Sequence, residues 1–402
     1  MTASSRVGLF GMFGSGNLGN NASMEAALRY LREAHPDAAV DVRCGGPEDV
    51  RARYHVAATP FLYYKGNATG LAGGALKALV KVADSVRLVA WVGRHDAVVI
   101  PGMGVFEGCL QTPPWGEPLR LFLVSLSGRL LGTKVGYLSV GADVLHPSRR
   151  ITGWLFTRAA RLAAYCSVRD PRSRDVLGEW GIDVAGVPVY PDLAFALPVP
   201  PPQDGDPKLV CVGVMDYRGG DDDRGREDEV RGRYVAQMTE FVQWLLSTGH
   251  DVRLLVGDAN GSDGSVVEEI LAATGQRLPD LAGGRLTAQP AVSLDDILAA
   301  MSPAGAVVAI RFHNIVAALM LGKPTLAISY GHKQDSLMAS AGQAEFCVHA
   351  KALDHQRLAA AFTELAGRAP AIREELRTGK AASEQLLTEQ FEIVAKALLP
   401  TG

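Results

Sequence analysis

Short apolar runs rich in Val, Ile and Leu alternate with longer amphipathic stretches along most of the chain. This alternation is typical of parallel βαβ units, in which helices cover both faces of a buried sheet. In the N-terminal half it predicts a helix near residues 23–33 and strands at residues 7–10, 39–42, 97–100, 135–140 and 187–190. We therefore expect an α/β fold.

A proline-rich segment at residues 198–207 interrupts the alternation, because proline fixes φ and lacks the N–H that a helix or central strand needs. The pattern then restarts, with a helix predicted at residues 234–247 and strands at residues 209–214, 252–256, 306–310 and 325–329. The 402 residues, 48% of them hydrophobic, suffice for two or three domains at roughly 150 residues each. Two α/β domains are thus predicted, at residues 1–197 and 208–381.

Charge and cysteine content exclude several classes of protein. Forty Lys and Arg residues against 43 Asp and Glu residues give a net charge of −3, which lacks the positive field that nucleic-acid binding needs. The cysteines form neither Cys-x-x-Cys pairs nor a dense secreted scaffold: Cys44, Cys109, Cys166, Cys211 and Cys347. The N-terminus lacks a signal-peptide pattern, and no apolar run approaches the roughly 20 residues that span a bilayer. We expect a cytoplasmic enzyme with reduced thiols and no nucleic-acid partner.

A glycine-rich segment, Gly14-Ser15-Gly16-Asn17-Leu18-Gly19, follows the first predicted strand and formally matches the dinucleotide pattern Gly-x-Gly-x-x-Gly. Such a loop brings backbone N–H groups close to an anion at a helix N-terminus. The pattern also requires an acid at the end of the second strand, whereas Asp41 lies inside that run. A tight turn that needs glycine, or a loop facing another kind of ligand, therefore stays open beside dinucleotide binding.

Two consecutive predicted strands in the second half each end in polar side chains. Arg311 and His313 follow the strand at 306–310, and Tyr330 and Lys333 follow the strand at 325–329. Parallel strands deliver such residues to the carboxyl edge of the sheet, where open α/β sheets bind ligands. Together these groups suit a small polyanion that must be protonated, although a structural ion pair and a buried histidine are the alternative.

Strand ends in the first half carry comparable candidates. They are Glu107, Asp143, Arg169 with Asp170, and Asp192. Carboxylates at such positions also commonly cap turns and helices.

Two further stretches have an unusual charge pattern. Residues 216–233 interleave acids, arginines and glycines, which favours a mobile solvated loop and leaves a lid over the site as the alternative. Residues 66–94 predict a basic amphipathic helix, which suits ordinary packing or contact with a membrane surface or a lipid-linked substrate.

Five blocks, in this order along the chain, resemble the polysaccharide pyruvyltransferase family. They are Gly14 to Ala26, Asp96 to Gly108, Ser167 to Ser173, Tyr190-Pro191-Asp192, and Arg311-Phe312-His313 through Gly322-Lys323-Pro324 to Tyr330-x-x-Lys333. The resemblance covers most of the chain. It implies two Rossmann-like domains facing across a cleft, as in the glycosyltransferase-B fold, with a final helix at residues 382–402 crossing back to the first domain.

The resemblance also implies an activity, namely transfer of the enolpyruvyl unit of phosphoenolpyruvate to sugar hydroxyls of a glycan or lipid-linked precursor. It assigns Arg311, the backbone of Phe312, Lys333 and Arg169 to donor binding, with His313 as the catalytic acid. The acceptor side would be the first domain, with these residues: Asn17, Asn20, Glu107 and Asp192. No metal or cofactor is expected besides the donor substrate, because no His, Asp or Glu set has ligand spacing.

Two positions depart from the family pattern on the acceptor side. Asn20 stands where an acid is common, and Met103 replaces one of two paired glycines. A nucleotide-sugar glycosyltransferase or epimerase of the same fold, and a noncatalytic glycan-binding paralogue, are the alternative functions. For the pyruvyltransferase we expect a cytoplasmic location. Contact with a membrane surface would place it at the inner face of the membrane.

Overall fold

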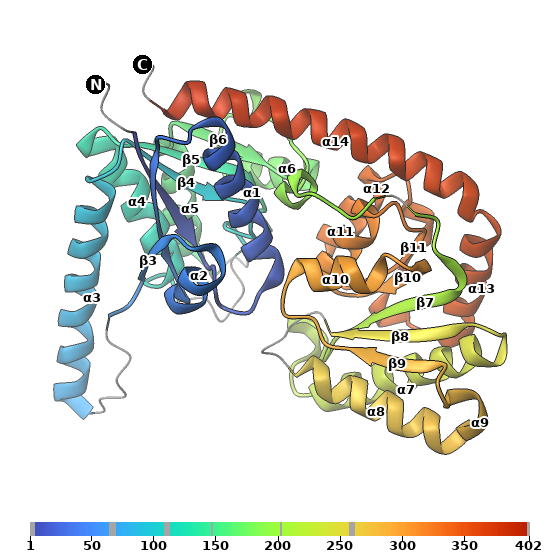
Figure 1. Cartoon of the computed structure of the whole chain (residues 1–402). Coiled ribbons are helices and arrows are strands. Elements are labelled where there is room, and N and C mark those ends of the chain that lie inside the picture. Colours follow the sequence, from blue (N-terminus) through green and yellow to red (C-terminus); the bar gives the residue numbers. More distant parts are fainter. Residues whose placement is uncertain are drawn as a thin grey trace. The chain divides into compact units, whose positions relative to one another are not determined.

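The computed structural model describes residues 5–63, 70–107, 113–145, 148–201, 203–256 and 262–399. The chain forms two compact units, each with its own parallel sheet and flanking helices (Figure 1). The first unit comprises Met1–Ser15, Asn20–Leu197 and Gln385–Gly402, and the second comprises Gly16–Gly19 and Pro198–Glu384.

The first unit is built around a parallel sheet that, within the described ranges, has six strands in the order β3-β2-β1-β4-β5-β6. The strands are β1 (Arg6–Gly11), β2 (Ala39–Cys44), β3 (Ala57–Pro60), β4 (Ala97–Pro101), β5 (Lys134–Val140) and β6 (Tyr165–Val168). In the central strand Leu9 lies between Val42 of β2 and Val99 of β4. All residues of β4 are buried, as expected for a strand covered on both faces.

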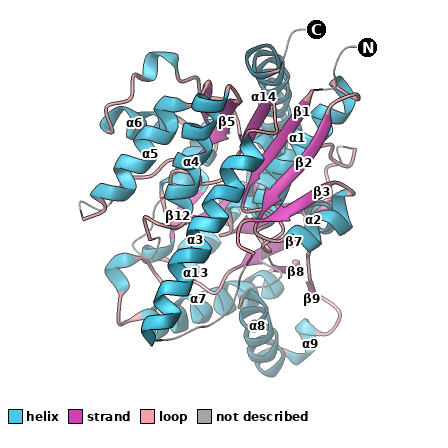
Figure 2. Cartoon of the chain, turned by 90° about the vertical axis from the view of Figure 1, so that its left-hand side faces the viewer, coloured by secondary structure: helices cyan, strands magenta, loops and turns pink. Residues whose placement is uncertain are grey.

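The helices of the first unit lie in layers against this sheet. They are α1 (Leu18–Ala34), α2 (Pro47–Tyr54), α3 (Gly70–Val92), α4 (Glu117–Leu131), α5 (Arg150–Leu162) and α6 (Pro171–Glu179), with short 3-10 turns η1 (Val184–Gly186) and η2 (Leu193–Ala196). Figure 2 shows α3, α4 and α5 side by side, and α4 contacts both of the others.

The second unit repeats the same architecture. Its described residues form a parallel sheet of six strands in the order β12-β11-β10-β7-β8-β9. The strands are β7 (Asp206–Val214), β8 (Asp251–Val256), β9 (Leu286–Gln289), β10 (Ala304–Ala309), β11 (Thr325–Ser329) and β12 (Cys347–His349). The β-branched runs predicted as buried strands are buried along β10 and β11.

The helices of the second unit include the last and longest one of the chain. They are α7 (Glu227–Ser247), α8 (Asp263–Arg277), α9 (Pro279–Ala282), α10 (Leu294–Met301), α11 (Phe312–Met320), α12 (His332–Ser340), α13 (His355–Gly367) and α14 (Ala369–Leu398), with 3-10 turns η3 (Asp221–Asp223), η4 (Ala344–Phe346) and η5 (Ala350–Ala352). From Gln385 onward α14 belongs to the first unit, where Phe391 stacks on Tyr30 at 4.6 Å between ring centroids.

Two sequence-based predictions of local structure are wrong. The predicted strand at 187–190 is only an isolated bridge between Val189 and Val168, because Pro188 and Pro191 flank it without N–H donors for a ladder. Residues 227–233 of the predicted mobile loop are the start of α7, which places Glu227, Asp228 and Glu229 in its first turn, where the helix dipole stabilises acids.

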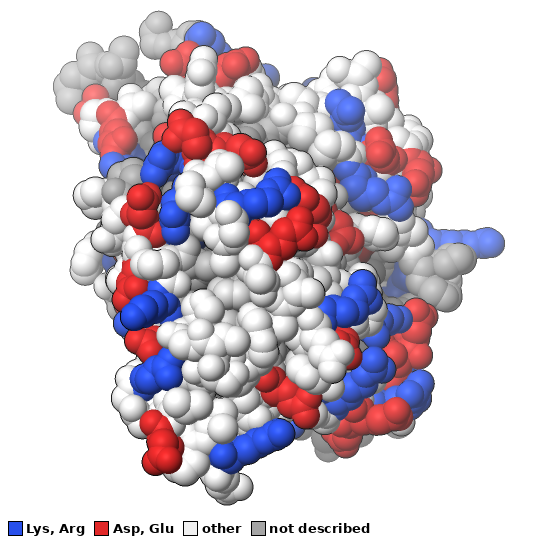
Figure 3. All heavy atoms as spheres, turned by 90° about the vertical axis from the view of Figure 1, so that its right-hand side faces the viewer, with Lys and Arg blue, Asp and Glu red and all other residues white. Residues whose placement is uncertain are grey.

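The charged surface of the chain is mostly mixed in sign. Figure 3 shows one face on which basic and acidic side chains lie interspersed. This arrangement agrees with the net charge of −3 and leaves local clusters, rather than a global field, to attract charged ligands.

Candidate active site

The predicted basic cluster lies at the carboxyl edge of the second sheet. Arg311 is the residue before α11, two positions beyond the end of β10, and Lys333 lies in the first turn of α12, which follows β11. Because β10 and β11 are parallel neighbours, both helices begin at the same edge. The structure therefore brings Arg311, Phe312, His313 and Lys333 to one edge of one sheet.

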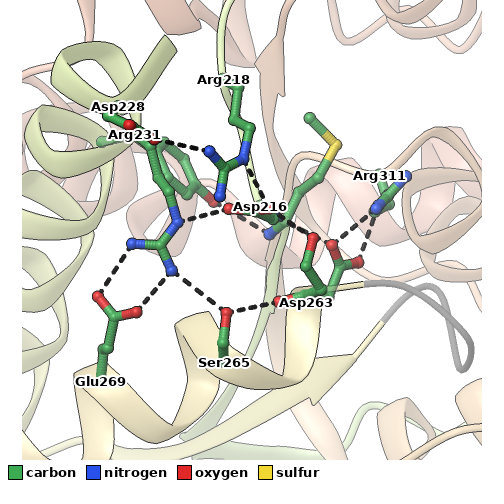
Figure 4. A network of polar contacts seen from close by, with 11 residues as sticks. Asp216, Arg218, Asp228, Arg231, Asp263, Ser265, Glu269 and Arg311 are labelled. Carbon is green, nitrogen blue, oxygen red and sulfur yellow. Dashed lines mark hydrogen bonds and ion pairs between the residues drawn. The ribbon is translucent and has the colours of Figure 1, made fainter.

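Arg311 is held by a carboxylate that the sequence did not reveal (Figure 4). Its Nε donates to Asp263 Oδ2 at 2.9 Å and its Nη2 donates to Asp263 Oδ1 at 2.6 Å. The Asp263 side chain is fully buried, whereas the Arg311 side chain keeps 28% of its surface exposed. The bidentate fork fixes the orientation of the guanidinium and offsets its charge.

A second acidic residue, Asp216, fixes Asp263 in turn through its backbone. The backbone N–H of Asp216 donates to Asp263 Oδ1 at 2.9 Å, and Asp216 itself accepts from Arg231 Nε at 2.6 Å and from Arg218 Nε at 2.9 Å. Although burial acts in the opposite direction, hydrogen bonds from Ser262, Arg218 and Arg231 hold the pKa of Asp216 below its ordinary value. Asp216, which belongs to the mixed-charge stretch at residues 216–233, thus holds Asp263, and Asp263 holds Arg311.

Two buried amide side chains near the same edge have polar atoms without a hydrogen-bond partner among the described residues. Asn314 is fully buried, and neither its Oδ1 nor its Nδ2 has a hydrogen-bond partner among the described residues. Gln334 is also fully buried, and within the same described part of the chain its Oε1 has none. Buried polar atoms are normally satisfied, so this pair indicates an edge built to meet water or a polar ligand.

The remaining predicted donor residues have aromatic neighbours. The ring of Phe312, 7% exposed, packs edge-on against His313 at 5.0 Å between centroids. Lys333 Nζ lies 5.8 Å from the centroid of Tyr330. The N-terminus of α11 adds partial positive charge next to Arg311.

In the first unit, three of the predicted candidates meet around a second arginine. Arg169 Nη2 lies 2.6 Å from Glu107 Oε1, and its Nη1 lies 3.5 Å from Asp192 Oδ2. Asp170, 3.9 Å from Arg169 Nε, also caps α6 by accepting from Ser173 N–H. A Cβ on Gly141 would lie 2.5 Å from Glu107 Oε1 and 2.6 Å from Arg169 Nη2, so this glycine makes room for the pair.

This cluster has more negative than positive charge. The described residues place one guanidinium against three carboxylates, and although burial acts to lower it, Glu107 and Asp192 raise the pKa of Arg169. The role of Arg169 as an anion ligand stays a prediction, and these surroundings favour a role in holding Glu107. Asp192 is 3% exposed and caps η2, while Glu107 is 26% exposed and is the more accessible carboxylate.

The glycine-rich segment is a strand-to-helix turn whose asparagines bond to its own backbone. Asn17 Oδ1 accepts from Gly19 N–H at 3.1 Å, and Asn20 Nδ2 donates to the Met12 carbonyl at 3.3 Å. An acid at position 20 has no N–H for the second bond. The acceptor-side roles of both asparagines stay predictions.

The other departure, Met103, also has a local explanation. Its backbone lies in the left-handed region at φ 65°, directly after Gly102 at φ 57°. Glycine adopts this conformation without strain, which explains why the family favours a glycine pair there. Met103 is 6% exposed, so packing of its side chain offsets the backbone strain.

Two further properties limit the chemistry. Across the described ranges, His, Cys, Asp and Glu side chains form no group of three that could hold a metal ion. In the same part of the chain, no helix is both long and apolar enough to cross a membrane.

Two α/β units, each with a parallel sheet and polar side chains at its carboxyl edge, have the architecture of the glycosyltransferase-B fold. The family model for polysaccharide pyruvyl transferase matches residues 17–332, and the chain belongs to that family. The prediction of the family and of a transferase is thereby confirmed. The family implies a glycan acceptor. No curated protein matches the sequence.

Solved structures confirm the predicted fold. The chain is similar to UDP-GlcNAc 2-epimerase from Methanocaldococcus jannaschii, with a TM-score of 0.59, 8% identity, and coverage of 89% of this chain and 92% of that one. It is also similar to UDP-GlcNAc 2-epimerase from Neisseria meningitidis bound to UDP-GlcNAc, with a TM-score of 0.56, 12% identity, and coverage of 96% and 99%. An Anabaena protein in complex with UDP has a TM-score of 0.59, 13% identity, and coverage of 98% and 99%. At these identities the likeness concerns the fold alone.

Proposed function

We propose that this protein transfers the enolpyruvyl unit of phosphoenolpyruvate to sugar hydroxyls of a glycan or glycolipid precursor and forms a pyruvate ketal. The observation that carries the proposal is the arginine fork at the second sheet edge, where buried Asp263 orients Arg311 beside the N-terminus of α11. A guanidinium fixed in this way suits a carboxylate or a phosphate. Membership of the pyruvyl transferase family supports the same donor.

The charge balance assigns different tasks to the basic groups. Asp263 offsets the charge of Arg311, so Arg311 contributes geometry more than net charge. Lys333, the protonated form of His313 and the dipole of α11 then offset the donor, which carries about three negative charges at neutral pH. Asn314 Nδ2 is available to donate to oxygens of phosphoenolpyruvate, whereas Asn314 Oδ1 and Gln334 Oε1 are acceptors and can meet those oxygens only through water.

The chemistry needs one proton donor and one proton acceptor. His313 gives its proton to the methylene carbon of the donor, which leaves an oxocarbenium-like C2. A sugar hydroxyl attacks C2 and loses its proton to a carboxylate. Among the predicted acceptor-side residues, Glu107 is the more accessible carboxylate beside Arg169. Phosphate then leaves with the proton that the carboxylate took up, a second hydroxyl closes the ketal, and the proton of that second hydroxyl returns to His313. General acid help of this kind contributes about 10²- to 10⁴-fold in rate.

Ligand-dependent stability tests the donor. Binding to the folded state alone raises stability by about 2.7 kcal/mol at a hundredfold excess over Kd, so a thermal shift separates the candidates. Stabilisation by phosphoenolpyruvate, followed by phosphate release that depends on an added glycan, is the expected result. Stabilisation by UDP-GlcNAc and not by phosphoenolpyruvate would indicate a nucleotide-sugar enzyme. Stabilisation by neither ligand would indicate a noncatalytic paralogue.

A further inference from the structure

The helices α3 and α4 of the first unit lie side by side (Figure 2). Their side chains line an apolar groove that the proposed reaction does not use. The groove has a volume of about 710 Å³, with Val82, Val86 and Val89 of α3 and Leu119 and Leu131 of α4 in its walls. Val82 and Val86 are each 62% exposed, and Leu131 is 54% exposed. A contiguous apolar surface of this kind marks an interaction site.

A small basic cavity adjoins the groove, because Lys81, Ser85 and Leu119 line both. The cavity has a volume of about 30 Å³, enough for about two water molecules. Arg43, at the end of β2, and Arg120, on α4, provide two of its walls.

The guanidinium of Arg43 is buried without enough hydrogen-bond acceptors. Arg43 is 2% exposed, and its Nη1 donates to the Arg87 carbonyl at 3.3 Å. Its Nε and Nη2, like Nε of Arg120, have no hydrogen-bond partner within the residues described. Burial lowers the pKa of both guanidinium groups, because it disfavours their charged forms. Donors left unsatisfied in a buried site are costly, and an anion would satisfy them.

Neighbouring charges only partly offset these cations. Asp84 lines the cavity too, but its Oδ1 accepts from Arg87 at 2.9 Å. Glu117 lies near enough to Arg120 to shift its pKa, and the ring of Tyr63 lies under the guanidinium of Arg87 at 4.8 Å. Among the described lining residues, three cations thus face one acid, Asp84, whose Oδ1 is paired with Arg87 and whose Oδ2 has no hydrogen-bond partner in the described part of the chain.

We propose that the cavity and the groove form one binding site for a phosphate-bearing lipid, with the phosphate on Arg43, Arg120 and Lys81 and the hydrocarbon chain along α3 and α4. The two parts of the site match the two parts of such a molecule. Phosphate oxygens accept from several N–H donors at once, and a hydrocarbon chain covers apolar side chains without needing any. This site is independent of the donor assigned above.

The surroundings favour a lipid over a water-soluble anion. Leu76 and Leu79 on α3, Trp115 before α4 and Leu130 on α4 extend the exposed apolar surface. Exposed side chains Lys77 and Arg94 add positive charge, and Asp84, the acid of the described part of α3, is buried. Apolar and basic residues together are typical of surfaces that bind anionic lipid.

Titration with a short amphiphile tests the proposal. Decyl phosphate, inorganic phosphate and decanol are each titrated into the full chain below the critical micelle concentration, with tryptophan fluorescence and calorimetry as readouts. We expect decyl phosphate to bind at least about tenfold more tightly than either of the others, because only it fills both parts of the site. If decanol binds as tightly as decyl phosphate, the cavity does not bind the phosphate group. If inorganic phosphate binds as tightly as decyl phosphate, the groove does not bind the hydrocarbon chain. Either result overturns the proposal.

Two variants separate the two parts of the site. Arg120→Gln should weaken decyl phosphate at least about tenfold and leave decanol unchanged. Val86→Asp should weaken decyl phosphate and decanol alike and leave inorganic phosphate unchanged. Lys208→Gln, which removes an exposed lysine of β7 in the second unit, is the matched control and should bind as the parent does.

Unfolding midpoints of the variants verify that each remains folded. Arg43→Met is informative only if its midpoint is preserved, because Arg43 is 2% exposed, and Arg120→Gln tests the same contact at a less buried residue. Unchanged decyl phosphate binding in Arg120→Gln would contradict the proposal. A self-association of the parent chain that Val86→Asp abolishes would assign the groove to a second copy instead, and sedimentation velocity measures it.

Discussion

The two sheets each present an arginine at the carboxyl edge, and the two arginines differ in charge balance. Arg311 faces the single carboxylate of Asp263 within the described residues, whereas three carboxylates of the described chain surround Arg169. Within the described residues, the first edge therefore has more negative than positive charge around its arginine, and the second edge pairs its arginine with one carboxylate. The proposed function assigns these two surroundings opposite purposes, an anion site and a site for hydroxyl protons.

The largest expected effect lies at the second edge, at the proton donor. His313→Asn keeps one hydrogen bond but delivers no proton, so turnover should fall about 10²- to 10⁴-fold while donor affinity changes much less. Steady-state kinetics together with calorimetric titration of phosphoenolpyruvate measure both quantities. His332→Asn, which changes an exposed histidine near the same edge, is the control and should stay active. A parallel loss of affinity and turnover in His313→Asn would contradict the assignment.

The next effect concerns stability and the first edge. Arg169→Met leaves buried carboxylates without their cation, so we expect a loss of about 3–5 kcal/mol in the free energy of unfolding. Denaturant unfolding measures the loss, and Arg172→Met, at an exposed pair with Glu179, should lose about 1 kcal/mol or less. If both variants lose only about 1 kcal/mol or less in the free energy of unfolding, Arg169 does not stabilise the three carboxylates. The proposed difference in charge balance between the two edges would then be wrong.

A smaller effect tests the fork of Arg311. Arg311→Lys retains the charge and loses the planar fork, so donor binding should weaken about ten- to a hundredfold, or roughly 1.5–3 kcal/mol. Asp263→Asn should lower donor affinity in the same direction, because it loosens the orientation of Arg311. Phosphoenolpyruvate affinity and the unfolding midpoint are measured on the same samples. Unchanged affinity in Arg311→Lys would remove Arg311 from the donor site.

Residues close together in sequence were predictable, and partners distant in sequence were not. The strand at Thr325–Ser329 matches its predicted bounds, and the predicted basic residues do follow β10 and β11. Asp263 lies 48 residues before Arg311, and no local pattern links the two. A position just beyond β8, at the same sheet edge, was the signal that could have found it.

Burial is the second property that the sequence hides. Arg43 directly follows the predicted strand at 39–42 and belongs to no motif, yet it is 2% exposed and lines the proposed lipid site. The basic helix near it was predictable from its periodicity. Which cation lies buried beneath that helix depends on how β2 packs against α3, and this is a tertiary property.

The last prediction tests a buried cation whose printed hydrogen-bond partner among the described residues is a carbonyl and not a carboxylate. Lys323 is 1% exposed and its Nζ donates to the Gln203 carbonyl at 2.8 Å, and burial together with nearby Arg373 lowers its pKa to about 8, opposite to the shift at Arg169. Between about pH 8 and the ordinary 10.5 the unfolded chain binds more protons than the folded chain, so this lysine makes stability rise with pH across that window. Lys323→Met should abolish the rise, and Lys208→Met, which removes an exposed lysine of β7, should keep it. Denaturant unfolding at several pH values in the window measures the slope, and equal slopes in the parent and Lys323→Met would show that a carbonyl partner suffices to keep a buried cation at its ordinary pKa.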